Sequence, residues 1–400
     1  MQGRISTLIC TLCINNPAVA IYLSPMTSLP NAPTPASTQA APARLPALDA
    51  LRGFDMFWLI GGELLPAALF TWTGWSVWQL VAQQFDHSPW HGFTFYDLIF
   101  PLFIFISGVS LGLQGHSLSG LPLAARKPQY VRALRRLLLL VLLGVVYNHG
   151  WGTGLPADPA AVRYASVLGR IGIAWFVAAM LLWHLRTRTV VVLTVAVLVV
   201  YSLVQLQWPL TEAGSLNALV DQALLPGITY RNAPFDPEGL YSQVGAIANC
   251  MVGAFAGILW RTQAAAPRRR LLVLAGMGGG LVLLACLLHP LYPLNKSLWT
   301  GSFTLLTSGL SVLLLLVFDL LLGQRPARLS KPLYWIGQNA ILVYLGTSLV
   351  MWTYSVKSLF GGWILASPMG IQPLLQALAL LLLQLLALRW LYQRKLFLRL

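Results

Sequence analysis

Stretches of about 20 apolar residues recur along almost the whole chain, and this recurrence limits the architectures that the chain can adopt. A helix of that length crosses a bilayer, whereas irregular backbone in contact with lipid would leave its polar groups unsatisfied. Charged residues make up only 9% of the chain and apolar residues 57%, while a soluble domain carries roughly 25% charged residues. The sequence therefore predicts an all-α, polytopic membrane protein.

About ten stretches have the length and apolar character of a spanning helix. They lie near residues 49–70, 96–115, 131–149, 164–185, 189–207, 240–260, 271–288, 299–322, 333–352 and 371–392. Residues 72–85 are too short and too polar to span. Their Trp residues predict an amphipathic segment at the membrane interface.

The positions of the basic residues predict the orientation in the membrane. With the N-terminus in the cytoplasm, all but five of the 26 Lys and Arg residues fall at cytoplasmic ends and loops. The exceptions are Arg163, Arg170, Arg231, Lys296 and Lys357. Both termini are therefore expected in the cytoplasm. The net charge of +15 reflects this orientation and does not indicate a nucleic-acid partner.

The N-terminal residues 1–48 differ from the rest of the chain. Pro, Ala, Ser and Thr dominate from Ser28 to Ala47, which predicts a disordered tail, and Met26 is an alternative start. Residues 49–400 are expected to form one transmembrane domain. The four cysteines form neither a disulfide framework nor a metal pattern, so no metal cofactor is expected.

The stretch 85–110 joins ionisable residues directly to an apolar span. His87, His91 and Asp97 lie at the predicted extracytoplasmic edge of the membrane, where such residues are costly unless they are paired or face a cavity. A histidine there can act as a general base or carry a covalent intermediate, or can be an ordinary loop residue. Asp97 either orients an imidazole or complements the dipole of the helix that it begins.

Polar residues also occur within the first expected helix. Asp49 and Arg52 form either a local ion pair or, through Arg52, a site for a phosphate group arriving from the cytoplasm. Asp55 and Glu63 lie deeper and roughly on one face, and each needs a partner or a cavity. The two glycines before Glu63 allow a break in the helix.

Further polar residues predict a polar central cavity. Arg170 lies in the middle of the fourth expected helix, so it should face a cavity or a carboxylate, with Glu63, Asp97 or a bound anion as candidates. Lys296 and Asn339 join this set, although a single Asn can also simply link two helices.

The segment 208–239, which contains Asp236, is the longest extracytoplasmic connection and a candidate lid. The sequence has no internal repeat, which weakens an inverted-repeat transporter interpretation. It also has no P-loop, dinucleotide-binding glycine pattern, G-x-S-x-G or H-E-x-x-H motif.

Several motifs along the chain resemble one known family. They are LDALRG, H-x-x-W-x-G followed by DLIFPLFIFISGVSL, VLGRIGI, FDPEGLYSQVGAIANCMVG, LNKSLWTGSF and IGQNAILVYLG. In this order, from about residue 45 to the C-terminus, they resemble the catalytic domain of the heparan-alpha-glucosaminide N-acetyltransferase family. Within it, the chain looks most similar to bacterial inner-membrane proteins linked to N-acetylglucosamine use.

The resemblance implies that acetyl is transferred from cytoplasmic acetyl-CoA to an amino sugar of the glucosamine type on the periplasmic side. The family's catalytic histidine falls on His87, and the aspartate of its D-L-x-F-P motif falls on Asp97. Glu63 and His91 stand where the family has asparagine. The third expected catalytic residue, Glu63, can therefore take up a proton where asparagine only orients.

Two further sets of residues are expected to bind the substrates. The substrate-binding set comprises Trp90, His91, Arg170, Asp236, Lys296 and Asn339. The set for the phosphates of acetyl-CoA comprises Asp49, Arg52, Arg132 and Arg136. His87 then either deprotonates the amine or carries the acetyl group itself. The chain is also compatible with a homodimer.

Two other functions are consistent with the same residues. A polar cavity in a helical bundle suits a permease for N-acetylglucosamine, which would need no catalytic histidine. A polytopic acyltransferase could instead transfer acyl groups to hydroxyls of an envelope polysaccharide. The amine acceptor is favoured by the resemblance more than by the residues themselves.

Overall fold

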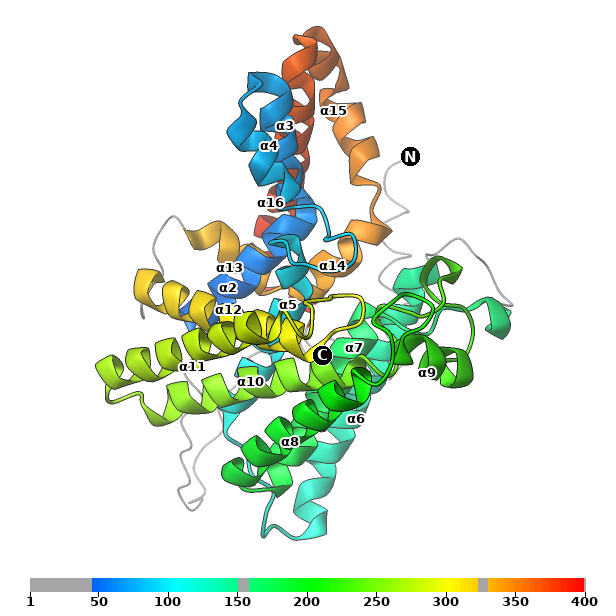
Figure 1. The fold of residues 1–400 in the computed structure, drawn as a ribbon. Helices are drawn as coiled ribbons and strands as arrows, with labels where there is room; N and C mark the ends of the chain where they lie inside the picture. The colour runs from blue at the N-terminus through cyan, green and yellow to red at the C-terminus, as the bar shows by residue number, and fades with distance from the viewer. Residues whose placement is uncertain (1–44, 150–157, 323–329, 399–400) are drawn as a thin grey trace, which may run out of the picture. The chain divides into compact units, whose positions relative to one another are not determined.

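The computed structural model describes residues 45–149, 158–322 and 330–398, and these fold almost entirely into helices (Figure 1). The one extended pairing recorded among them is an isolated antiparallel bridge between Arg163 and Gly227. Nearly all of the predicted tail, residues 1–44, lies outside this range. The all-α prediction is therefore confirmed for the described part of the chain.

Seven helical segments of the described chain are long and apolar enough to cross a membrane. They are α5 (Tyr96–Gln114), α7 (Val167–His184), α8 (Thr187–Gln205), α10 (Gln243–Thr262), α11 (Pro267–Leu288), α12 (Gly301–Leu322) and Met369–Gln393, which contains α16 (Gln372–Gln393). An eighth span exists if the bent pair at the start of the fold, Pro46–Gly62 and Leu64–Thr73, counts as one.

The bend in the first span occurs where the sequence places two glycines. Helix α2 (Pro46–Phe57) continues through a short π-helical turn and meets α3 (Leu64–Thr73) at 51°. Gly61 has φ of 116°, which side chains other than hydrogen rarely tolerate. The bend places Glu63 at the junction of the two halves.

Two of the expected spans differ from the prediction. The segment expected at 131–149 is part of a longer helix, α6 (Leu123–His149), which is not among those seven segments. The segment expected at 333–352 is wrong as a single span. It is divided into α13 (Lys331–Gly337) and α14 (Ala340–Leu349), and α15 (Trp352–Ala366) follows. The backbone leaves helical geometry at Asn339, whose side chain bonds the backbone of the C-terminal segment instead.

The centre of the fold is the close contact of α5 with α10. A methyl group added at Gly108 would lie 1.9 Å from the carbonyl oxygen of Cys250, and one at Gly253 would lie 2.1 Å from that of Phe105. The two backbones therefore touch, as small residues permit between membrane helices. Helix α7 packs against both α5 and α10.

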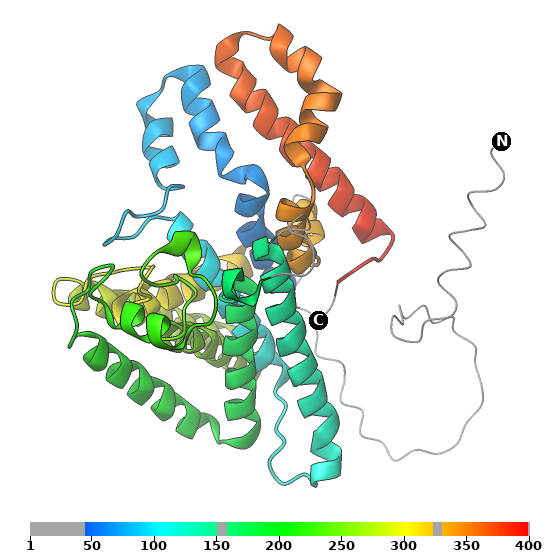
Figure 2. The same cartoon turned by 90° about the vertical axis from the view of Figure 1, so that its right-hand side faces the viewer.

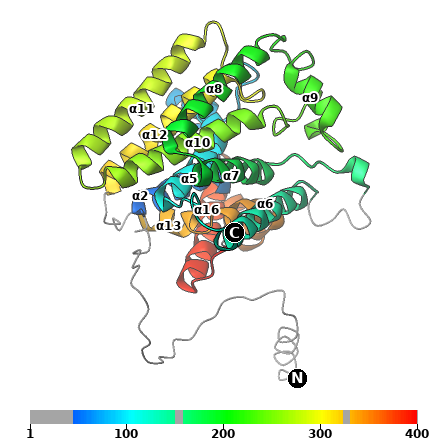
Figure 3. The ribbon, with the colours of Figure 1, turned by 90° about the horizontal axis from the view of Figure 1, so that it is seen from below.

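The remaining helices form groups around this centre. Helices α8, α10, α11 and α12 lie next to one another (Figure 3). Helix α3 packs on α16, which pairs with α15 (Figure 2). The expected interfacial segment contains a short helix, α4 (Ser76–Gln83), and the segment 208–239 contains α9 (Leu216–Leu224).

Candidate active site

The loop between α4 and α5 is held in a closed shape that presents His87. The amide of Tyr96 donates to the carbonyl of Gln84 across its base, at 2.9 Å. Phe85 packs on Trp58, with 4.7 Å between ring centroids. At the far side of the loop, the amide of Gly92 donates to the carbonyl of Leu294 at 2.9 Å. This last bond joins the loop to the segment that carries Lys296, although more than 200 residues separate them.

Asp97, in the first turn of α5, accepts hydrogen bonds that hold the loop in its shape. Its side chain is buried. One oxygen, Oδ2, accepts from the amide of Ser88 at 3.3 Å and from the amide and hydroxyl of Thr94, each at 3.2 Å. The other oxygen, Oδ1, lies 2.8 Å from Nδ1 of His87. Four donors therefore converge on this carboxylate, which fixes the imidazole in place.

The sequence left the partner of Asp97 open, and the structure pairs it with His87. His91, the other histidine considered, lies 3.3 Å through Nδ1 from the amide nitrogen of Asn295. Burial and the neighbouring His289 lower the pKa of His91. His91 thus belongs to the support of the loop, whereas the side chain of His87 remains 54% exposed.

Lys296 completes a cluster of three groups. Its Nζ lies 3.4 Å from Oδ1 of Asp97, and 3.0 Å and 3.2 Å from Nδ1 and Nε2 of His87. One hydrogen arrangement satisfies the cluster: Nδ1–H donates to Asp97, and Nε2 accepts from the ammonium of Lys296. Burial lowers the pKa of Lys296, and the attraction of Asp97 only partly opposes that shift.

His87 and Lys296 lie at the polar end of a cavity of about 210 Å³. Its other polar groups are Glu238 and the hydroxyls of two tyrosines. The full lining is Met56, Leu59, His87, Tyr96, Ile99, Phe100, Phe103, Val167, Leu168, Ile171, Glu238, Lys296 and Tyr344. The walls come mainly from α2, α5 and α7 and are mostly apolar. The sequence led us to expect a polar central cavity; in this one, the polar groups gather at one end.

Glu63 reaches this cluster through Tyr96. The side chains of Glu63 and Tyr96 interact, and the ring of Tyr96 lies 5.0 Å from that of His87. One carboxylate oxygen of Glu63 is buried without a hydrogen-bond partner among the described residues. Glu63 does not itself line the cavity.

A network of ion pairs holds the end of the 208–239 segment over the cavity. Arg163 donates to both oxygens of the buried Asp236, each at 2.7 Å, and also to Glu238. The amides of Tyr230 and Glu238 donate to Asp236 as well, at 2.8 Å and 2.9 Å. Burial would lower the pKa of Arg163, but its acidic partners outweigh burial and raise it. The candidate lid is therefore strongly anchored at this end.

Arg170 is paired with neither of the two carboxylates that were expected as its partners. Its guanidinium donates to the carbonyl of Gly239 at 3.2 Å and to the hydroxyl of Ser242, and it lies 4.8 Å from the centre of the Trp299 ring. Neither Glu63 nor Asp97 is paired with it. The turn before α10 packs onto α7 at this point, and the carbonyl of Gly239 and the hydroxyl of Ser242 both accept from the Arg170 guanidinium. Arg170 therefore links the anchored segment to α7.

The residues expected to bind the phosphates of acetyl-CoA are only partly brought together. Arg52 pairs with Asp49 at 3.1 Å and donates to the hydroxyl of Ser110 at 3.1 Å. Arg136 stacks on Trp175 at 4.1 Å, lies close enough to Arg52 for their charges to repel, and has a buried Nε without a partner in the described chain. Arg132 is exposed and donates to its own helix, at the carbonyl of Pro128.

Both carboxylate oxygens of Asp55 are also buried without partners among the described residues. Asp55 and Arg136 both lie near Arg52, so the interior here contains one carboxylate and one arginine, Arg136, that are incompletely paired. Such an arrangement is costly in a membrane interior unless something else completes it.

Two more expected substrate-binding residues lie outside the lining of the cavity. Trp90 donates through Nε1 to the carbonyl of Leu210 at 2.9 Å and packs on Phe235, so it joins the loop to the 208–239 segment. Asn339 donates to the carbonyl of Leu396 and accepts from the amide of Leu398. Nothing in these contacts connects Asn339 with His87, and its expected role stays a prediction.

Sequence reasoning missed Glu238 and Tyr96 as lining residues. Glu238 lies in the FDPEG motif beside Asp236, which drew the attention instead, and Tyr96 looked like one aromatic among many. Among the described residues, no group of three His, Cys, Asp or Glu side chains is placed to hold a metal ion.

Comparison with known proteins gives a family match over the first half of the fold. The model of the family "Heparan-alpha-glucosaminide N-acetyltransferase, catalytic" matches residues 44–238. That range includes His87, Asp97 and Glu238 but ends before Lys296. The loop that carries His87 and the carboxylate of Asp97 therefore fall within the match, and Lys296 does not.

Two curated proteins, both named heparan-alpha-glucosaminide N-acetyltransferase, are similar to most of this chain. The one from Mus musculus is 24% identical over 372 residues, which cover 78% of this chain and 54% of the relative. The one from Homo sapiens is 23% identical over 365 residues, which cover 77% of this chain and 53% of the relative. The chain thus spans about half the length of the curated relatives that it matches.

Proposed function

Because the chain is a distant relative of the heparan-alpha-glucosaminide N-acetyltransferases, we propose that it is a membrane acetyltransferase. The proposed donor is acetyl-CoA and the proposed acceptor is the amino group of an amino sugar of the glucosamine type. The observation that carries the proposal is the contact of His87 with Asp97 and Lys296 at the polar end of a cavity.

This cluster has the groups that acyl transfer to an amine requires. The amine nitrogen attacks the thioester carbonyl carbon, and the resulting tetrahedral intermediate expels the thiolate. Nε2 of His87 takes the proton from the amine and returns it to the thiolate, while Asp97 holds Nδ1–H and stabilises the imidazolium. The ammonium of Lys296 can shift from Nε2 to the developing oxyanion. An amide and a free thiol are the products.

A two-step route uses the same residues. Nε2 of His87 attacks the thioester carbon, the C–S bond breaks and the thiolate leaves. The amine then attacks the acetyl-imidazole, the C–N bond to Nε2 breaks, and a proton from the amine is left to the thiolate, so that an amide and a free thiol are again the products. The mostly apolar walls of the cavity suit an acetyl group and the end of a thioester arm. Glu238, at the same end as Lys296, is available to the acceptor.

The donor is proposed to approach from the cytoplasm, past Arg52 and Arg136, because these two cations lie close together and Arg136 has a buried nitrogen without a partner in the described chain. The acceptor side is then the periplasm, and the membrane the inner membrane of a bacterium. This orientation rests on the distribution of Lys and Arg along the chain.

The proposal is tested with the purified full chain in liposomes. Acetyl-CoA consumption with external glucosamine is measured for wild type and for His87→Ala. We expect acetylation by the wild type only. Full activity of His87→Ala would overturn both routes, and labelled acetyl retained on the protein without an acceptor would select the two-step route.

The same liposomes separate the competing functions. Uptake of N-acetylglucosamine without acetyl-CoA would indicate a permease. Acetylation of glycans that carry only hydroxyl groups would indicate an O-acyltransferase.

A further inference from the structure

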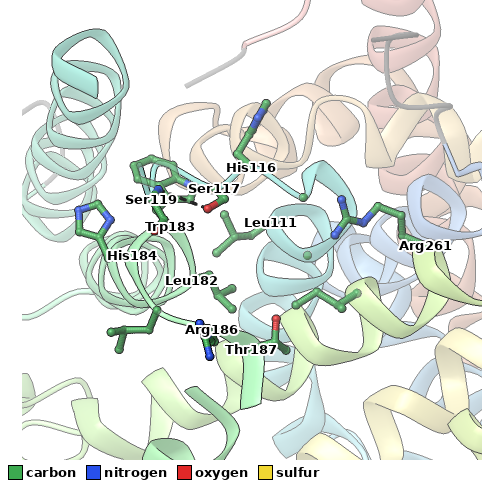
Figure 4. A pocket seen from close by; sticks show the side chains of 14 residues that line it. Leu111, His116, Ser117, Ser119, Leu182, Trp183, His184, Arg186, Thr187 and Arg261 are labelled. Atoms are coloured by element: carbon green, nitrogen blue, oxygen red, sulfur yellow. Dashed lines mark hydrogen bonds between the residues drawn. The ribbon is translucent and has the colours of Figure 1, made fainter. Parts of the chain in front are cut away.

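A second cavity, of about 270 Å³, lies at the opposite ends of the helices that wall the first one (Figure 4). It is formed where α5, α7 and α10 end and α8 begins. Its lining is Leu111, Gly112, Gly115, His116, Ser117, Ser119, Leu182, Trp183, His184, Leu185, Arg186, Thr187, Ile258 and Arg261. Along α5 the first cavity is lined by residues 96–103 and the second by residues 111–115, so their centres lie roughly 20 Å apart at ~1.5 Å per residue.

The charged groups of this cavity are all basic and incompletely paired. The side chains of Arg186 and Arg261 make no hydrogen bond or ion pair with any described residue, and the lining contains no carboxylate. The guanidinium of Arg261 is directed over Gly115, where a methyl group would collide with it. Figure 4 shows Arg186, Arg261 and His116 around the same space. An anion would find several donors there and no competing acidic side chain.

A buried donor in the lining is also unsatisfied. The side chain of Trp183 is only 4% exposed, and its indole Nε1 has no hydrogen-bond partner among the described residues. A buried N–H without a partner costs about 1–3 kcal/mol. The indole N–H itself is covered by protein atoms, so Trp183 contributes a buried wall to the cavity.

Backbone donors add to the side chains. Helix α8, of 19 residues, begins at Thr187, and no side chain caps its N-terminus. The first amides of such a helix have no intrahelical partner and carry partial positive charge. The hydroxyls of Ser117, Ser119 and Thr187 lie in the same lining.

We propose that this cavity binds the phosphate group of an anionic ligand. Tetrahedral phosphate has enough acceptor oxygens to engage two guanidinium groups and the amides of a helix N-terminus together. Arg268 and Arg269, which follow in the same part of the chain, are exposed, as Arg186 and Arg261 are, but they line no described cavity. They represent ordinary membrane-edge basic residues, and they supply the matched control.

The phosphate can belong to a lipid headgroup or to a free phosphate compound. Both present the same chemistry to the cavity, and the experiment must separate them. The full chain is purified into nanodiscs of phosphatidylcholine alone, or of phosphatidylcholine with phosphatidylglycerol. The variants are the double substitution Arg186→Gln with Arg261→Gln and the control Arg268→Gln with Arg269→Gln.

In phosphatidylcholine nanodiscs, inorganic phosphate and pyrophosphate are titrated while the thermal midpoint is followed. A free phosphate ligand predicts a rise in midpoint for the wild type and the control. The double variant should bind roughly tenfold or more weakly, as the loss of charge-assisted hydrogen bonds implies. In mixed nanodiscs, native mass spectrometry should show phosphatidylglycerol retained by the wild type and the control, and lost from the double variant, if the ligand is a lipid.

Either result supports the site and shows whether the phosphate belongs to a free compound or to a lipid headgroup. Equal behaviour of wild type and double variant in both nanodiscs would overturn the proposal. If the double variant fails to fold, Ser117→Glu replaces it, because its carboxylate enters the cavity and keeps both arginines. Ser117→Glu should lose the response to phosphate and to phosphatidylglycerol, and an unchanged response would overturn the proposal. These readouts measure binding alone, so they stand whether or not the chain transfers acetyl groups.

Discussion

The two ends of the α5–α7 helix pair differ in how their charges are partnered. At the end that begins with Asp97, His87, Lys296 and the carboxylate contact one another, and Arg163 is paired nearby. At the other end, Arg186 and Arg261 have no partners in the described chain. Charges that are paired in advance hold a reactive group in one geometry. Unpaired charges of one sign need a ligand of the other sign.

The largest expected effect is at the reactive group itself. His87→Ala should lower acetyl transfer by roughly 10²–10⁴-fold, the usual contribution of a positioned general acid–base group. Since the side chain is more than half exposed, the thermal midpoint should stay within a few degrees of the wild type. Steady-state rates and thermal unfolding, measured on the same preparation, check both parts. A comparable loss of acetyl transfer in Arg186→Gln would contradict the difference between the two ends of the α5–α7 helix pair.

Asp97→Asn should have the next largest effect, and it should lower both the activity and the stability. Both carboxylate oxygens now accept hydrogen bonds, one from His87 and the other from the Ser88 and Thr94 amides. In asparagine an NH₂ group replaces one of these oxygens, so a donor would face a donor. We expect about a 10²-fold loss of activity and a fall of about 1–3 kcal/mol in the free energy of unfolding. Loss of activity with no change in stability would show that the carboxylate does not organise the loop.

Paired and unpaired arginines can be compared directly. Arg163→Met leaves the buried Asp236 without its partner and should cost about 3–5 kcal/mol of stability. Arg186→Met removes a side chain with no partner and should cost about 0.5 kcal/mol or less. Denaturant unfolding of both variants in the same detergent makes the measurement. Equal losses of stability in the two variants would mean that the pairing of Arg163 does not stabilise the fold.

The smallest expected effect concerns pH. Burial lowers the pKa of Lys296, so this lysine loses its proton at a lower pH than a free lysine, which titrates near pH ~10.4. Wild-type activity should therefore fall on the alkaline side below that pH. Lys296→Arg, which stays charged, should extend activity to higher pH. Profiles of kcat/KM against pH compare the two proteins, and coincident alkaline limbs would remove Lys296 from the cluster.

The linked stability has a definite sign. Between the lowered folded pKa and the unfolded pKa of Lys296, the folded state binds fewer protons than the unfolded state. Stability should therefore rise with pH through that window. The Lys296→Arg protein should lack this rise.

The sequence predicted the features that depend on short segments of chain. Apolar runs identified most of the helices, and Gly61 and Gly62 marked the bend before Glu63. His87 and Asp97 were both identified as candidates, and they are only ten residues apart, although spacing alone left His91 as a second possible partner of Asp97. Local patterns suffice for such features because helix geometry and short loops determine them.

Features that depend on distant segments were not predictable in the same way. Lys296 was known only as a polar residue near a span, and its contact with His87 arises because two loops far apart in the sequence are joined at Gly92. The partner of Arg170 depends on how the turn near Ser242 packs onto α7. The break at Asn339 was missed because the apolar run in the sequence continues across it. The hydrogen bonds of the Asn339 side chain to the C-terminal segment cannot be read from that apolar pattern.

The contact of α5 with α10 has a consequence for how substrates reach the cavity. With carbonyl oxygens facing Gly108 and Gly253 at such short range, the two helices cannot slide or rotate past each other without collision. They act as a fixed wall. We therefore expect any opening of the cavity to occur where helical geometry is interrupted in the opposite wall, at the break between α13 and α14 and at Gly61.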